Sequence, residues 1–167
     1  MEKRILLCFS AGGHFTQMQQ LISCLPSNSF KMISEDAPDV LEFKNKNKIE
    51  TLILPKIISN RFLFLLKNIT YLFQIIRTIK SCDLMISTGG ITSVIPGLMC
   101  FICRKKILFV ETIAKQNELT ITGKLFYLIA NKFYVQSRRL AEMYQKAEYV
   151  GTLYKLGKSS FILALKK

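Results

Sequence analysis

The chain is short of acidic residues, and it has only one histidine. Its 167 residues include 11 Asp or Glu against 24 Lys or Arg, a formal net charge of +13. The excess is uneven: residues 1–60 carry seven basic and six acidic side chains, whereas residues 61–167 carry seventeen and five. A basic surface favours anionic lipid, phosphorylated substrates or nucleic acid. We expect no nucleic-acid partner, because the aromatic residues lie in apolar runs rather than among basic ones.

Long apolar runs and metal-binding motifs are also missing. No stretch reaches the ~18 uninterrupted apolar residues that span a bilayer. We expect no secretory signal, because only five apolar residues follow Arg4. No DxD-like acidic pair is present, so we expect neither a bound metal nor another cofactor. The five cysteines, including Cys100-x-x-Cys103 with no second such pair, are expected to be buried thiols in a reducing cytoplasm.

Strand-like and helix-like segments alternate along the chain. Segments with helical spacing separate short apolar runs at residues 5–9, 30–33, 51–54, 84–87, 107–110 and 133–136. Apolar strands that alternate with helices are typical of an α/β fold with a doubly wound parallel sheet. The length suits one domain, so we expect residues 1–167 to form one.

Residues 61–80 contain four basic residues but no acid, proline or glycine. On a helical wheel their apolar side chains fall on one broad arc. This pattern predicts an amphipathic helix that lies in the interface of an anionic membrane, and the alternative is a helix that packs on the core. The residues expected at the membrane are Arg61, Phe64, Lys67, Leu72, Phe73 and Arg77.

Two glycine pairs follow predicted strands. Ser10-Ala11-Gly12-Gly13-His14 comes after the first strand and opens a helix, and Ser87-Thr88-Gly89-Gly90 follows a later strand. Paired glycines let a backbone approach a ligand closely, and a helix N-terminus favours an anion. All strands of a parallel sheet end at one edge, so the two loops should converge in one cleft. The alternative is a pair of tight turns.

Two side chains near these loops are candidates for a catalytic base. His14 follows the first glycine pair, and Glu111 follows the strand at residues 107–110. Either can take a proton from an attacking hydroxyl, and the alternative for His14 is a structural histidine. Thr120 and Gly123 mark a helix start, where Thr120 is either a ligand contact or simply the helix N-cap.

Several segments, taken in order, resemble a known family. They are FSAGGHFTQM, DLMISTGG, KKILFVETIAKQNELTITGKLFYLIANKFYVQS and AEYVGTLY. They resemble the PssD/CpsF group of bacterial polysaccharide-synthesis proteins. That group is similar to the membrane-anchor subunit of the eukaryotic enzyme that adds the second GlcNAc to dolichol-linked oligosaccharide. The resemblance runs from Ile5 to Tyr154.

The resemblance implies the N-terminal, acceptor-side half of a GT-B glycosyltransferase, related to the acceptor half of MurG. A separate PssE-like subunit would bind the UDP-sugar, and the acceptor would be a polyprenyl-diphosphate-linked sugar of capsular or exopolysaccharide synthesis. The chain would work peripherally at the cytoplasmic face of the cell membrane, and the alternative is a non-catalytic anchor that recruits a catalytic partner. With His14 and Glu111 as catalytic candidates, the implied acceptor-binding residues are Ser10, Gly12, Gly13, Thr88, Gly89, Gly90, Lys115, Thr120 and Gly123.

Overall fold

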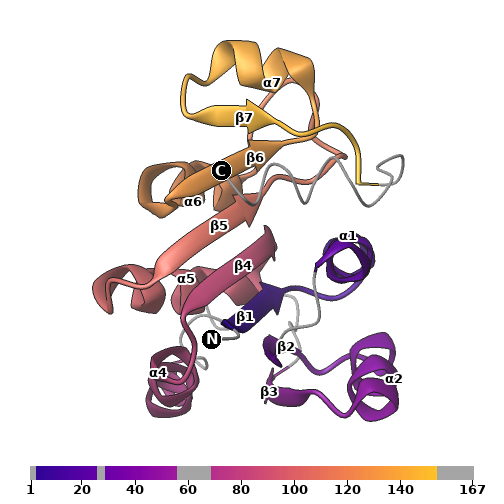
Figure 1. The fold of residues 1–167 in the computed structure, drawn as a ribbon, viewed down its shortest axis with the longest axis vertical. Coiled ribbons are helices and arrows are strands. Elements are labelled where there is room, and N and C mark those ends of the chain that lie inside the picture. Colours follow the sequence, from indigo (N-terminus) through magenta and orange to yellow (C-terminus); the bar gives the residue numbers. More distant parts are fainter. Residues whose placement is uncertain (1–2, 26–28, 56–68, 154–167) are drawn as a thin grey trace.

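The computed structural model describes residues 3–25, 29–55 and 69–153 (Figure 1). The strands are β1 (Arg4–Phe9), β2 (Ser29–Glu35), β3 (Glu50–Leu54), β4 (Leu84–Gly89), β5 (Lys106–Val110), β6 (Lys132–Val135) and β7 (Ala147–Tyr149). They form one seven-stranded sheet in the order β3-β2-β1-β4-β5-β6-β7. Every neighbouring pair is parallel, which confirms the predicted α/β fold with a doubly wound parallel sheet.

Helices cover both faces of the sheet (Figure 1). They are α1 (Gly13–Cys24), α2 (Pro38–Asn47), α4 (Leu72–Lys80), α5 (Val94–Ile102), α6 (Ile121–Ile129), α7 (Arg138–Met143) and the short 3-10 turn η1 (Ile91–Ser93). In β1, Leu6 and Cys8 join the core cluster beneath α4, α5 and α6, whereas Ile5 and Leu7 join the cluster beneath α1 and α2. Both faces of the strand are therefore buried, which is why its sequence is an unbroken apolar run.

The strand order reverses between β1 and β4. From β1 the chain winds outward to β2 and β3, and it then returns through α4 to β4 and winds the other way to β7. In open parallel sheets, ligands bind outside the carboxyl ends of the strands at this switch point. Figure 1 shows the arrowheads of β1 and β4 at the side of the sheet where α1 lies. The loops at residues 10–14 and 88–90 therefore meet where such a fold binds its ligand.

Only part of the predicted amphipathic helix lies within the described residues. Arg61, Phe64 and Lys67 lie outside them, and α4 forms the later half. Ile75 and Ile79 are buried in the core, whereas the side chain of Phe73 is 78% exposed. The apolar arc is therefore shared: the side with Ile75 and Ile79 packs on the sheet, as the core alternative predicted, and the side with Phe73 faces outward. None of the described helices is long and apolar enough to cross a membrane.

Two elements were missed or only partly anticipated from the sequence. The strand β7 has three residues, of which only Ala147 is buried, so it carries no apolar run. The helix α2 fully buries only Val40, while Phe43 is partly buried against the core and most other residues are polar, so its hydrophobic period is weak. All five cysteines are free thiols, and all but Cys103 are buried. Burial raises the pKa of Cys100 to about 12, so this thiol stays protonated and unreactive near neutral pH.

Candidate functional site

The two glycine loops are in direct contact at the switch point. The Ser10 N–H donates to the Gly89 carbonyl at 3.2 Å, and the Ser10 hydroxyl donates to the Thr92 hydroxyl at 2.9 Å. Gly90 has a φ of +88°, and a Cβ at this position would overlap the Ser10 hydroxyl. Only glycine allows this close approach. The predicted convergence of the two loops at one edge of the sheet is confirmed.

The imidazole of His14 is held between the loops, and among the described residues only its Nδ1 has a hydrogen-bond partner. Its Nδ1 lies 2.7 Å from the Thr88 carbonyl oxygen, and the Thr88 hydroxyl donates to the His14 carbonyl at 2.8 Å. A carbonyl can only accept, so Nδ1 carries the proton and the lone pair is on Nε2. Burial lowers the pKa of His14, although the Thr88 carbonyl and the Glu35 carboxylate act in the opposite direction. A neutral imidazole with an open acceptor nitrogen is suited to general-base chemistry.

Glu35 belongs to this site, and the sequence analysis did not single it out. It is the last residue of β2, and its side chain is only 7% exposed. Its Oε1 accepts the Ala11 N–H at 2.8 Å, so the carboxylate lies against the loop that carries Gly12 and Gly13. Gly12 is the N-cap of α1 and offers no side-chain cap. Extending the predicted strand by two residues would have placed Glu35 at the same edge as the glycine loops.

Glu111 also lies at this edge, but its carboxylate is engaged within the fold. It is 1% exposed; Oε1 accepts the Thr112 N–H at 2.9 Å and Oε2 accepts the Thr120 N–H at 3.0 Å. The Thr120 hydroxyl lies 3.1 Å from both oxygens. Burial raises the pKa of Glu111, while these donors lower it. The side chain therefore serves as an internal anchor for the segment that leads into α6.

Thr120 and Gly123 are part of the same anchor. The Thr120 hydroxyl accepts the Gly123 N–H at 2.8 Å, so Thr120 is the N-cap of α6, which was the simpler of its two predicted roles. A Cβ at Gly123 would overlap Glu111 Oε2. Glycine at this position therefore lets the start of α6 sit directly against the carboxylate.

A buried pair of amides joins α1 to the loops that follow β5 and β6. Gln17 Nε2 donates to the Thr112 hydroxyl at 2.9 Å, and its Oε1 accepts from Gln136 Nε2 at 2.6 Å. Gln136 also donates to the Glu111 carbonyl at 3.0 Å and accepts the Leu153 N–H at 2.9 Å. These bonds link residues up to 119 positions apart. They fix the position of α1, and with it His14, relative to the neighbouring strand ends.

Lys115 provides positive charge on the β5 side of the site. Its Nζ lies 2.8 Å from Glu118 Oε1, and the two side chains are 41% and 61% exposed. An exposed pair of this kind contributes little to stability, so Lys115 can exchange Glu118 for an anionic ligand at small cost. Its charge lowers the pKa of Glu111.

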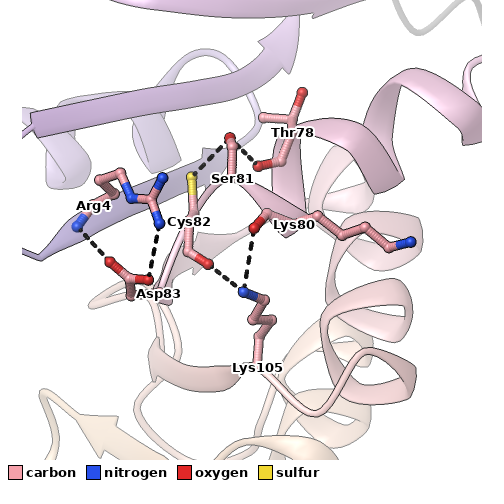
Figure 2. A network of polar contacts seen from close by, with 7 residues as sticks. All are labelled: Arg4, Thr78, Lys80, Ser81, Cys82, Asp83 and Lys105. Atoms are coloured by element: carbon pink, nitrogen blue, oxygen red, sulfur yellow. Dashed lines mark hydrogen bonds and ion pairs between the residues drawn. The ribbon is translucent and has the colours of Figure 1, made fainter.

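The opposite edge of the sheet carries a separate polar network, which Figure 2 shows. The Arg4 N–H donates to Asp83 Oδ2 at 3.0 Å, joining the starts of β1 and β4. Lys105 Nζ donates to the Cys82 carbonyl at 2.6 Å and to the Lys80 carbonyl at 3.4 Å, at the end of α4. These partners close the turn between α4 and β4. The network is structural, and it lies at the edge of the sheet away from His14.

Solved structures share the fold. MurG from Acinetobacter baumannii aligns with a TM-score of 0.66 at 14% identity, over 89% of this chain and 45% of that one. A UDP-GlcNAc 2-epimerase from Neisseria meningitidis, bound to UDP-GlcNAc, aligns with a TM-score of 0.65 at 12% identity, over 98% of this chain and 50% of that one. The chain therefore spans about half the length of these proteins. At these identities the similarity establishes the fold and not the reaction.

Sequence comparison identifies the family. The UDP-N-acetylglucosamine transferase subunit ALG14 of Debaryomyces hansenii is 25% identical over 175 residues, which cover 89% of this chain and 75% of that protein. The model of the family "Oligosaccharide biosynthesis protein Alg14 like" matches residues 56–153. That segment is more than half of the chain, and it contains the second glycine loop, Glu111 and the α6 anchor. The chain thus belongs to the Alg14-like family of oligosaccharide-biosynthesis proteins.

Proposed function

We propose that this chain is the acceptor-side subunit of a two-chain glycosyltransferase, with residues 1–167 forming one acceptor-binding domain. Its relatives are named as subunits of a UDP-N-acetylglucosamine transferase, and its fold matches about half of each of the larger proteins described above. A second, PssE-like chain would supply the half that binds the UDP-sugar. The acceptor would be a polyprenyl-diphosphate-linked sugar, used in capsular or exopolysaccharide synthesis.

The observation that carries this proposal is the state of His14. Its Nδ1–H is held by the Thr88 carbonyl at 2.7 Å, and no described residue occupies Nε2, which can therefore accept a proton at the switch point of the sheet. In the proposed step, Nε2 takes the proton of the acceptor hydroxyl while that oxygen attacks C1 of the donor sugar. The bond between C1 and the nucleotide diphosphate breaks, and the diphosphate leaves with the electron pair. Glu111 is the weaker candidate base, because donors of the fold already occupy both of its oxygens.

A lipid-linked acceptor requires the chain to work at a membrane, and the exposed surface of the neighbouring helices α4 and α5 suits that. Phe73 of α4 and Ile102 of α5 are exposed, and α4 packs beside α5. Basic residues accompany them, including Arg77 and Arg104. Exposed apolar side chains beside basic ones are typical of peripheral binding to anionic lipid. We propose that this face contacts the cytoplasmic surface of the cell membrane.

The catalytic part of the proposal is tested by kinetics of the reconstituted pair. The chain is purified with its donor-side partner, and transfer of labelled sugar from a UDP-sugar to a polyprenyl-diphosphate-linked acceptor is measured. His14→Ala should lower kcat by roughly 10²–10⁴ if the imidazole is the proton acceptor. Gln20→Ala, an exposed change on the same helix, should leave kcat unchanged.

The same assay tests the alternative, in which the chain is a non-catalytic membrane anchor. The exposed apolar face of α4 and α5 favours that alternative. An anchor would recruit a fully catalytic partner and contribute no catalytic group. Full activity of both His14→Ala and Glu111→Gln in the reconstituted pair would establish the anchor and refute the catalytic proposal. A loss confined to Glu111→Gln, in protein that remains folded, would move the base to that carboxylate.

A further inference from the structure

Glu35 has one carboxylate oxygen that the fold does not use. Oε1 accepts the Ala11 N–H at 2.8 Å, whereas Oε2 is buried without a hydrogen-bond partner in the described part of the chain. Buried carboxylate oxygens normally have a donor, because leaving one unpaired costs free energy. Oε2 therefore calls for a donor from outside the described structure.

The position of Glu35 indicates what that donor is. The carboxylate lies against the glycine loop that opens α1, and its charge acts on the imidazole of His14. The N-terminus of a helix alone would attract an anion. A carboxylate fixed in front of it opposes a phosphate group at the same place and accepts a hydrogen bond from a neutral hydroxyl instead.

We propose that Glu35 determines specificity in the acceptor site, where its Oε2 accepts a hydrogen bond from a hydroxyl of the acceptor sugar. The inference rests on the proposed function and refines it. The sugar lies at the β1–β2 end of the site, beside His14. The diphosphate is kept from this end and lies toward β5 and α6, where Lys115 and Lys124 supply positive charge. Gly12 and Gly13 then let the sugar approach the backbone closely, and they do not bind an anion.

His14 is the only histidine, so its imidazole proton resonances report on this site without ambiguity. The isolated chain is titrated separately with methyl glycosides of glucose, galactose and N-acetylglucosamine, and with inorganic pyrophosphate. In the wild type, at least one glycoside should shift the His14 resonances saturably, whereas pyrophosphate should leave them nearly unchanged. A pyrophosphate shift in the wild type, or no response to any glycoside, overturns the proposal without recourse to a variant.

Glu35→Gln keeps an oxygen for the Ala11 N–H and removes the charge. It should weaken glycoside binding by about tenfold or more, because a hydrogen bond to a charged group is lost. Pyrophosphate should now shift His14, since the helix N-terminus is no longer opposed. Glu42→Gln makes the same charge change at an exposed position of α2 and should behave as the wild type. Identical responses of Glu35→Gln and the wild type to both probes would show a merely structural carboxylate and refute the proposal.

These titrations need neither the partner chain nor turnover. Their outcome can therefore refute the sugar subsite without refuting the proposed function. If His14→Ala slows the reconstituted pair but Glu35→Gln leaves both probes unaffected, only the sugar subsite is wrong. If the probes respond as expected but His14→Ala keeps full activity, the subsite stands and the catalytic role of His14 falls. In the reconstituted pair, Glu35→Gln should raise KM for the acceptor more than it lowers kcat.

Discussion

Replacing Gly123 by alanine tests the anchor that joins Glu111 to α6. A methyl group at this position would overlap Glu111 Oε2 and would lie 2.9 Å from the Thr120 hydroxyl oxygen. The carboxylate is 1% exposed and surrounded by the fold, so it has little room to move aside. We expect the variant to lose the bond from the Thr120 N–H to Oε2 and to weaken the cap of α6.

The size of the effect follows from those contacts. A hydrogen bond to a charged group contributes about 1.5–3 kcal/mol, and an N-cap contributes about 1 kcal/mol. The better helix propensity of alanine offsets about 1 kcal/mol. Gly123→Ala should therefore destabilise the chain by about 1.5–3 kcal/mol. For a chain of this length, that corresponds to a melting temperature lower by about 3–12 °C.

The assay is thermal unfolding followed by circular dichroism, with Gly13→Ala as the matched control. Gly13 also begins a helix, but a Cβ there meets no atom within 4 Å, and its φ is not in the left-handed region. The control should change stability by less than about 1 kcal/mol. If the two variants melt at the same temperature, Glu111 is not the anchor that its contacts indicate. It would then regain its place as a candidate base.

Three further predictions concern the other features of the structure. Since the pKa of His14 is lower in the folded chain than in the unfolded one, the wild type should lose stability as the pH falls from about 7 to about 5. His14→Gln should remove that part of the slope in urea titrations at several pH values, and equal slopes would contradict the shift. Gln136→Leu should cost about 2–4 kcal/mol, because it leaves buried partners unpaired, whereas the exposed change Gln20→Leu should cost almost nothing in the same denaturation assay. Phe73→Ser should weaken sedimentation with anionic vesicles while the chain stays folded, whereas Ile75→Ser should unfold the chain. If Phe73→Ser leaves vesicle binding unchanged, the proposed membrane face is wrong.

The sequence was sufficient to predict the sheet and the meeting of the glycine loops. Both depend on rules that act along the chain: strands buried on both faces read as apolar runs, and parallel strands end at one edge. Those rules place Ser10, Gly90 and Glu111 correctly at the ends of β1, β4 and β5. They do not reveal what each side chain touches once it is there, which is why Glu111 could not be recognised as an internal anchor.

Contacts between distant segments were beyond the reach of the sequence. The bond between Gln17 and Gln136 spans 119 residues and has no local signal. Glu35 resembles any other acidic residue after a strand, and only its burial and the hydrogen bond from Ala11 distinguish it. The role of α4 was ambiguous, because a helix that packs on a core and a helix that lies on a membrane show the same hydrophobic period in sequence. Only the structure distinguishes the buried Ile75 from the exposed Phe73.

The central claim is that this chain supplies only the acceptor half of the enzyme, and calorimetric titration with a UDP-sugar tests it most directly. UDP-N-acetylglucosamine is titrated into the isolated chain and into the chain mixed with its donor-side partner. We expect no saturable heat for the isolated chain and saturable binding for the mixture. Binding by the isolated chain with a Kd of about 1 μM, equivalent to roughly 8 kcal/mol, would contradict it, because the chain would then hold a donor site of its own.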